Sequence, residues 1–336
     1  MNTELYLILI TFISSALLLY LYKKLSYKIN ILDIPNYLSV HSKKTPTGAG
    51  IVFFIIFFLL YLLSITDLIK DFDLFQNQKN YKILFISLGI LSTISFYDDI
   101  KNIHPVIRLF FQCTIIFFCT SLFDYSAINN IPLKLCIFAT IYFWVYTINI
   151  INFTDGVDGF LAINAITFFS STFLYFYLIE SKIFLYYLSV IMLPILFSYL
   201  FFNRPKALLF MGDSGSIFIG FLIGFVSIQL IFLGRYDIVI TLLSYTYIDC
   251  TITIIKKIFN KQYPWARLFD YYFLIPIKNN FPHKKVFFAN IVYNSCIMAI
   301  VAIQIIYNIK LLFILSLFLA TCLIFYFNSF SRTARS

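Results

Sequence analysis

Three short segments carry aspartates, and two of them also carry glycines, in a chain that is otherwise very poor in charge. Only 12% of the 336 residues are charged, whereas 61% are hydrophobic. Charged groups are costly at membrane depth, so acids kept among apolar stretches indicate a function. Carboxylate and amide oxygens beside glycine turns are suited to holding a divalent cation and a phosphate group. The segments are Asp98-Asp99, Asn149 to Gly159 and Phe210 to Ser216.

The adjacent carboxylates of Asp98 and Asp99 lie where an apolar segment ends. They repel each other, and the carboxyl end of a helix is already negative, so a cation or a basic partner is needed nearby. We interpret both as candidate catalytic residues, acting as a base or through a bound cation. The alternative is a pair of interfacial acids that are neutralised by Lys101 and Arg108.

The second segment joins two apolar spans and carries amides followed by acids. Asn149 and Asn152 are three residues apart and share one helix face. We predict that Asn152 offers its carbonyl oxygen to a metal ion, whereas Asn149, Asp155 and Asp158 contact substrate. Because a helix start favours an acid, Asp158 could instead be only a helix cap.

Asp213 stands at the start of the next glycine-marked helix. Its carboxylate is a candidate ligand for Mg²⁺, which takes few carboxylates and keeps water or phosphate oxygens. The free N–H groups of this helix start would suit a phosphate. The alternative is an Asp/Ser helix cap.

Two loops carry further candidates for substrate binding. The loop over residues 33–50 mixes turn, hydroxyl and basic residues, and the loop over 257–285 is strongly basic, as is fitting for an anionic nucleotide or a lipid phosphate. Both could instead be ordinary positive loops that set orientation. Asp249, in an apolar segment, is either a site residue or a polar contact between helices. The candidates in the loops are Asn36, His41, Arg267, Asp270, His283 and Lys284.

The positioning elements must be membrane-spanning helices, since mean hydropathy is +0.89 and a span needs about 20 apolar residues. We predict an all-α polytopic membrane protein of about eleven helices, forming one domain over 1–336 without an internal repeat. We expect the first stretch to be a retained helix rather than a signal peptide. The segments are 4–22, 48–66, 81–97, 105–123, 132–151, 159–178, 182–201, 214–233, 237–256, 286–307 and 309–328.

The distribution of Lys and Arg predicts the orientation. If residues 23–47 lie inside the cell, most of the 25 basic residues fall in inside segments, with the N-terminus out and the C-terminus in. All three acidic segments then lie on the inside, at helix ends. The net charge of +10 is explained by these loops, and no nucleic-acid motif is present, so we predict no nucleic-acid partner.

Together these segments resemble the polyprenyl-phosphate N-acetylhexosamine-1-phosphate transferase family. The family includes transferases that initiate O-antigen synthesis and, more distantly, the phospho-MurNAc-pentapeptide translocase. The resemblance covers nearly the whole chain. Its motifs are Asp33-x-Pro35-Asn36 with Ser39-x-His41 and Thr45-Pro46-x-Gly48-x-Gly50, the pair Asp98-Asp99, Asn149-x-x-Asn152-x-x-Asp155-Gly156-x-Asp158-Gly159, and Met211-Gly212-Asp213-x-Gly215-Ser216.

The resemblance implies that a polyprenyl (undecaprenyl) phosphate attacks the β-phosphorus of a UDP-activated N-acetyl sugar, giving a polyprenyl-diphosphate-sugar and UMP. Mg²⁺, or Mn²⁺, would be held by Asp213 with Asn152. Asp98 or Asp99 would deprotonate or orient the lipid phosphate. The enzyme would start O-antigen or another envelope glycan, from the cytoplasmic side of the inner (plasma) membrane, and could be a homodimer.

The last large loop departs from the family pattern. Many relatives carry a histidine-rich motif where this chain has Arg267 and Asp270, whereas Pro282-His283-Lys284 resembles the family. Arg267 could bind phosphate as a permanent cation, but Asp270 cannot replace an imidazole. The departure leaves sugar specificity open. The pentapeptide translocase's Gly-Thr-Pro-Thr-Met-Gly-Gly loop is absent, which argues against that substrate. Two rival interpretations are a cation-coupled transporter and an inactive relative.

Overall fold

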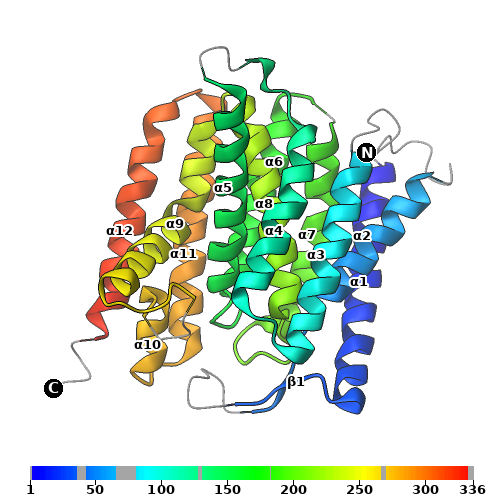
Figure 1. The fold of residues 1–336 in the computed structure, drawn as a ribbon, viewed down its shortest axis with the longest axis vertical. Coiled ribbons are helices and arrows are strands. Elements are labelled where there is room, and N and C mark those ends of the chain that lie inside the picture. The colour runs from blue at the N-terminus through cyan, green and yellow to red at the C-terminus, as the bar shows by residue number, and fades with distance from the viewer. Residues whose placement is uncertain are drawn as a thin grey trace.

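The helices stand side by side in a bundle (Figure 1). The structure is a computed structural model that describes residues 2–35, 43–65, 81–127, 131–181, 183–265 and 270–331. Each of the eleven predicted segments coincides with a helix. These are α1 (Asn2–Ile29), α2 (Gly50–Ile65), α3 (Tyr81–Lys101), α4 (Pro105–Cys119), α5 (Leu133–Phe153), α6 (Phe160–Leu178), α7 (Phe184–Asn203), α8 (Gly212–Phe232), α9 (Tyr236–Phe259), α11 (His283–Ile306) and α12 (Phe313–Ser329).

The predicted class, a polytopic helical membrane protein, is confirmed. Within the described residues, ten helical segments are long and apolar enough to cross a membrane. Helix α2 is shorter, with an apolar stretch over Gly50–Leu63. The number of spans and the orientation in the membrane therefore stay predictions.

The structure departs from the expected elements at helix ends and in loops. Helix α1 continues to Ile29, past the predicted end at residue 22. In this extension the ammonium group of Lys24 lies 4.5 Å from the centre of the Tyr20 ring. The loops contain small elements that the hydrophobic periodicity of the sequence does not predict. They are the antiparallel strands β1 (Leu32–Asp33) and β2 (Thr45–Pro46), helix α10 (Ile275–Lys278), and the 3₁₀ turns η1 (Thr120–Leu122), η2 (Tyr125–Ala127), η3 (Tyr272–Leu274) and η4 (Lys310–Leu312).

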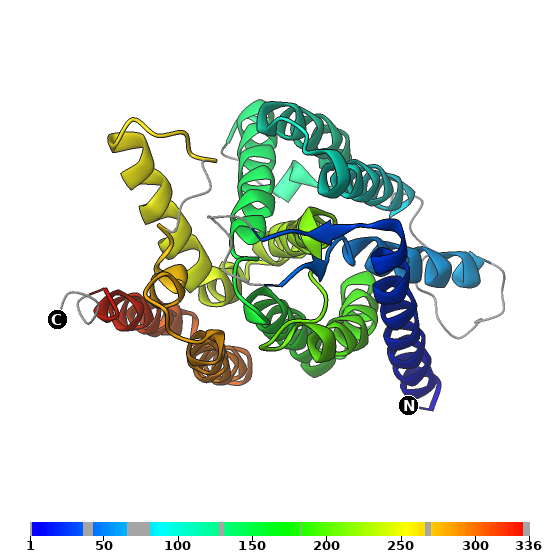
Figure 2. The same cartoon turned by 90° about the horizontal axis from the view of Figure 1, so that it is seen from below.

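Helix α8 is the centre of the bundle, with other helices around it when seen from below (Figure 2). Phe218, Phe221 and Phe225 on α8 are fully buried. Close packing fixes α8 against α5: a side chain at Gly224 would overlap Trp144, whose indole N–H donates to the Phe221 carbonyl at 2.8 Å. The amino end of α8, where Asp213 stands, is therefore held firmly in place.

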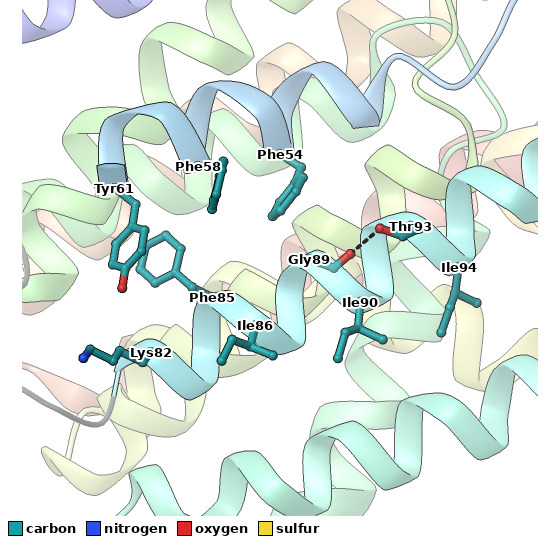
Figure 3. A pocket seen from close by; sticks show the side chains of 10 residues that line it. All are labelled: Phe54, Phe58, Tyr61, Lys82, Phe85, Ile86, Gly89, Ile90, Thr93 and Ile94. Atoms are coloured by element: carbon teal, nitrogen blue, oxygen red, sulfur yellow. Dashed lines mark hydrogen bonds between the residues drawn. The ribbon is translucent and has the colours of Figure 1, made fainter. Parts of the chain in front are cut away.

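A groove of about 530 Å³ lies between α2 and α3, away from the acidic segments (Figure 3). The two helices approach closely at Gly89, where a Cβ atom would lie 3.0 Å from the ring of Phe54. The lining is mostly apolar, with Lys82 at one end. The groove is lined by Phe54, Phe58, Tyr61, Lys82, Phe85, Ile86, Gly89, Ile90, Thr93 and Ile94. No acidic residue lines this groove, so it is separate from the candidate site.

Candidate functional site

Asp99, at the end of α3, binds the amino end of α8. Its two carboxylate oxygens accept the backbone N–H groups of Asp213 at 2.7 Å and of Ser214 at 3.1 Å. Gly212 makes this possible: its φ is +70°, and a Cβ atom would lie 2.5 Å from Asp99 Oδ2. The expectation that these N–H groups are free for phosphate is wrong for these two, because Asp99 already accepts them.

Asp98 and Asp213 are joined by one guanidinium. Arg108 of α4 donates through the same terminal nitrogen to both carboxylates. Asp98 also accepts the backbone N–H of Ile103 and is 6% exposed, whereas Arg108 is 20% exposed. Arg108 thus forms a charged bridge between the ends of α3 and α8 and remains reachable from solvent.

Asn152 joins this cluster from the end of α5. Its carbonyl oxygen accepts the hydroxyl of Ser216, in the first turn of α8, at 2.8 Å. Asn149, one turn earlier, makes a different contact. Its amide donates to Gln112 of α4 at 2.7 Å and to the Val145 carbonyl at 2.8 Å. The two amides share a helix face, but their described contacts lead to different helices.

Asp155 follows α5 and belongs to the same electrostatic group. Shielding from water, and then the negative charges of Asp213, Asp99 and Asp158, raise the pKa of Asp155 well above its usual value. These charges come from three separate segments of the chain. The structure therefore brings the three predicted acidic segments together at one end of the bundle.

Asp158, three residues after Asp155, contacts two other parts of the chain. One of its oxygens accepts the N–H of Ala207 at 3.1 Å. The other lies 3.3 Å from Nδ1 of His283, at the start of α11. Lys284 beside His283 is exposed. Of the predicted last-loop residues, His283 thus contacts the second segment, at Asp158.

The first loop reaches the same end of the bundle through its backbone. Phe210 donates to the Pro46 carbonyl at 2.8 Å, and Ala49 and Gly50 donate to residues 210 and 211 at 3.2 and 3.0 Å. A side chain on Gly50 would overlap the backbone of Gly215. Of the predicted loop residues, Asp270 is exposed, whereas three lie outside the described residues. These three are Asn36, His41 and Arg267.

Comparison with known proteins addresses the acidic segments directly. Residues 81–231, which contain all three of them, match the family model described as glycosyl transferase family 4. Over this range the chain is similar to that transferase family. It is 27% identical over 278 residues to the phospho-N-acetylmuramoyl-pentapeptide-transferase of Sulfurimonas denitrificans, covering 72% of this chain and 74% of that protein.

A second relative is named for a different sugar. Over 261 residues the chain is 26% identical to the probable undecaprenyl-phosphate N-acetylglucosaminyl 1-phosphate transferase of Bacillus subtilis, covering 71% of this chain and 68% of that protein. The family predicted from the motifs is confirmed, and so is its function as a sugar-1-phosphate transferase. Nothing in the comparisons supports a transporter or an inactive relative.

The oxygen donors of the site can be compared with those that a magnesium ion takes in proteins. Within the described residues, no group of three or more His, Cys, Asp or Glu side chains is arranged to hold a metal ion by itself. The donors at hand are the Asp213 carboxylate and the Asn152 carbonyl oxygen. Mg²⁺ binds through one or two carboxylates and takes its other oxygens from water and phosphate. The residues present therefore fit such an ion.

Sequence reasoning missed Arg108 as a member of the site. It is the only charged residue of α4, and the sequence suggested only that it might neutralise the aspartate pair. Its contact with Asp213 spans 105 positions. Ser216, which orients Asn152, was likewise noted only as part of a helix start. A polar residue isolated on an apolar helix is the signal that could have found Arg108.

Proposed function

We propose that this protein transfers an N-acetylated sugar-1-phosphate from a UDP-sugar to polyprenyl phosphate, giving polyprenyl-diphosphate-sugar and UMP. The main observation is the charged bridge from Asp98 through Arg108 to Asp213 at the amino end of α8. A bridge of this kind places a fixed cation among carboxylates where two phosphate substrates must meet. The printed activities of the relatives support the same reaction class.

The reaction joins two anions, so charge and position decide its rate. An oxygen of the lipid phosphate forms a bond to the β-phosphorus of the UDP-sugar. The bond from that phosphorus to the oxygen shared with the α-phosphate breaks, and UMP leaves with this oxygen. Mg²⁺, or Mn²⁺, held by Asp213 with Asn152, would supply neutralisation of the diphosphate charge when bound.

Among the described residues, Arg108 is well placed to bind a phosphate. It has five N–H donors in a planar fork, of which one terminal nitrogen serves Asp98 and Asp213. Asp98 orients the guanidinium rather than acting as a strong base, because its oxygens already accept hydrogen bonds from Ile103 and Arg108. A lipid phosphate is largely ionised near pH 7, so a strong base is not required.

The second aspartate of the pair acts through α8. By accepting two N–H groups, Asp99 sets the position of the helix start that carries Asp213. The nucleotide-sugar would lie on the side of Asp155 and Asp158, where His283 contacts Asp158 and Lys284 adds positive charge. The two substrates then approach from opposite sides of Asp213.

The experiment is UMP release by the purified protein with undecaprenyl phosphate, Mg²⁺ and a panel of UDP-N-acetyl sugars, with and without EDTA. We expect lipid-dependent and metal-dependent UMP from one donor, and none from Asp213→Asn. The matched control is Asp124→Asn, because Asp124 is an exposed acid after α4, at its other end. Folded protein that releases no UMP from any donor would overturn the proposal. Full activity in EDTA would overturn only the metal.

We also propose that the site faces the cytoplasm, across the inner (plasma) membrane. The basic loops and the acidic cluster lie at the same end of the bundle, where β1 and α10 are seen at the lower edge of Figure 1. A reporter enzyme that is active only in the cytoplasm, fused after residue 336, should be active. Activity of a periplasm-specific reporter at that position would reverse the orientation.

A further inference from the structure

Asp249 is a fully buried carboxylate on α9, outside the acidic cluster. From its own helix it accepts the hydroxyls of Tyr245 at 2.8 Å and of Thr253 at 3.3 Å. From a distant loop it accepts the backbone N–H groups of Tyr272 at 3.0 Å and of Phe273 at 3.3 Å. These four donors are neutral, so Asp249 is satisfied by hydrogen bonds rather than by an ion pair.

The two loop donors open the short helical segment η3–α10, which spans Tyr272–Lys278. A carboxylate that accepts the first N–H groups of a helical turn stabilises that turn, in the manner of a helix cap. Here the carboxylate comes from another helix. Asp249 therefore attaches the segment to α9, beneath which it lies in Figure 1.

The attached segment packs on the acidic segment of the site. A Cβ atom on Gly156 would lie 3.2 Å from Leu274 Cδ2 and 3.4 Å from Phe273 Cε2. The ring of Phe273 stacks on Phe160, with centroids 4.9 Å apart. Gly156 stands between Asp155 and Asp158, so the position of the segment sets the backbone that carries both acids.

The residue just before the segment, Tyr271, makes two further contacts that fix its position. The Tyr271 ring stacks on Phe153, at the end of α5, with centroids 5.8 Å apart. The ammonium group of Lys257, a residue only 1% exposed, lies 4.7 Å from the centre of the same ring. The segment is thus clamped between α9 on one side and the end of α5 on the other.

We propose that Asp249 is a positioning residue for the nucleotide-sugar half of the site. Through its bonds to the segment, it holds Phe273 and Leu274 against Gly156. It thereby sets the positions of Asp155 and Asp158 for binding the UDP-sugar. This inference rests on the proposed function, which places the donor beside those two acids. None of the four hydrogen bonds of Asp249 involves Asp98 or Arg108, so the lipid half of the site should not depend on it.

The test compares the two substrates in UMP release by the full chain. For Asp249→Ala we expect the KM for the UDP-sugar to rise about tenfold, with the KM for lipid phosphate changed by less than about twofold. Asp249→Asn should show a smaller rise, because its amide oxygen can accept only one of the two N–H groups. The matched control is Tyr245→Phe, which removes a donor within α9 but leaves both backbone bonds, and its donor KM should stay near wild type.

A double mutant distinguishes a positioning role of Asp249 from a general loss of protein stability. Phe273→Ala should raise the donor KM in the same way, and combining it with Asp249→Ala should add little, because both act through one contact. Hydrogen exchange gives a second readout: the amides of Tyr272 and Phe273 should exchange faster in Asp249→Ala, while those of α8 do not change.

The outcomes distinguish the two proposals. Equal changes in both KM values, an unchanged donor KM in an active Asp249→Ala protein, or unaltered exchange at Tyr272 and Phe273 would overturn the role of Asp249. A wild-type protein that releases no UMP would overturn the proposed function, and the donor role with it. Exchange would then still decide whether Asp249 holds the segment. If Asp249→Ala does not fold, Asp249→Asn and Phe273→Ala carry the same comparison.

Discussion

The acids at the amino end of α8 and the single buried acid of α9, Asp249, differ in how their negative charge is compensated. At the amino end of α8, the carboxylates of Asp98 and Asp213 share the guanidinium of Arg108, and Asp99 beside them accepts two backbone N–H groups. In α9, Asp249 stands alone among four neutral donors. Like charges that gather in excess of their counter-charges favour the binding of a cation or the uptake of a proton, whereas a single, fully hydrogen-bonded acid needs neither. Within the described residues, Asp249 is thus compensated by neutral hydrogen bonds, whereas the acids at α8 gather like charges around one arginine.

The largest expected difference between the two groups is in turnover. Asp213→Ala should lower kcat by about a thousandfold, as loss of a main electrostatic group does, while Asp249→Asn keeps most of the wild-type kcat. Circular dichroism and size-exclusion chromatography should find both variants folded. Comparable kcat values for the two variants would mean that the charge-rich end is not the reaction centre.

The bridge itself is tested at Arg108. Arg108→Gln should lower kcat by about a hundredfold, because both the phosphate donor and the link between Asp98 and Asp213 are lost. Arg108→Lys keeps a point charge but loses the planar fork, so we expect partial activity. The measurement is UMP release at saturating substrates. Wild-type activity in Arg108→Lys would contradict the need for a fork.

A smaller loss of turnover is expected from a substitution at Gly212, where the Asp99 carboxylate contacts the start of α8. Gly212→Ala places a methyl group against the Asp99 carboxylate, and should lower kcat about tenfold and reduce the thermal midpoint. Gly234→Ala is the matched control, because Gly234 also has a positive φ, +74°, but no atom within 4 Å of the added group. Both variants carry the same backbone cost of about 1–2 kcal/mol. Equal activity losses would show that backbone strain alone is responsible.

The smallest predicted effect concerns His283 beside Asp158. His283→Gln should raise the donor KM about threefold, since one polar contact near Asp158 is weakened, with the lipid KM unchanged. Steady-state kinetics with each substrate varied in turn would measure this. A rise in the lipid KM instead would move His283 to the other half of the site.

Hydrophobic runs and local motifs in the sequence were enough to predict most of the fold and part of the site. The eleven segments were predictable because apolar length is a property of consecutive residues. Asp99, Asn152 and Asp213 stood out because polar groups interrupt such runs. Asn149 looked equivalent to Asn152, yet its amide contacts Gln112 on α4. Helix periodicity states which residues share a face but not which neighbour that face meets.

By itself, the sequence determined that this chain is a bundle of membrane helices with acids at helix ends, and its motifs identified the transferase family. The tertiary structure alone decided that Arg108 bridges Asp98 and Asp213, and that Asp249 holds the loop at Tyr272. The physical reason is distance along the chain: partners 105 positions apart meet only through the packing of whole helices, which no local pattern encodes.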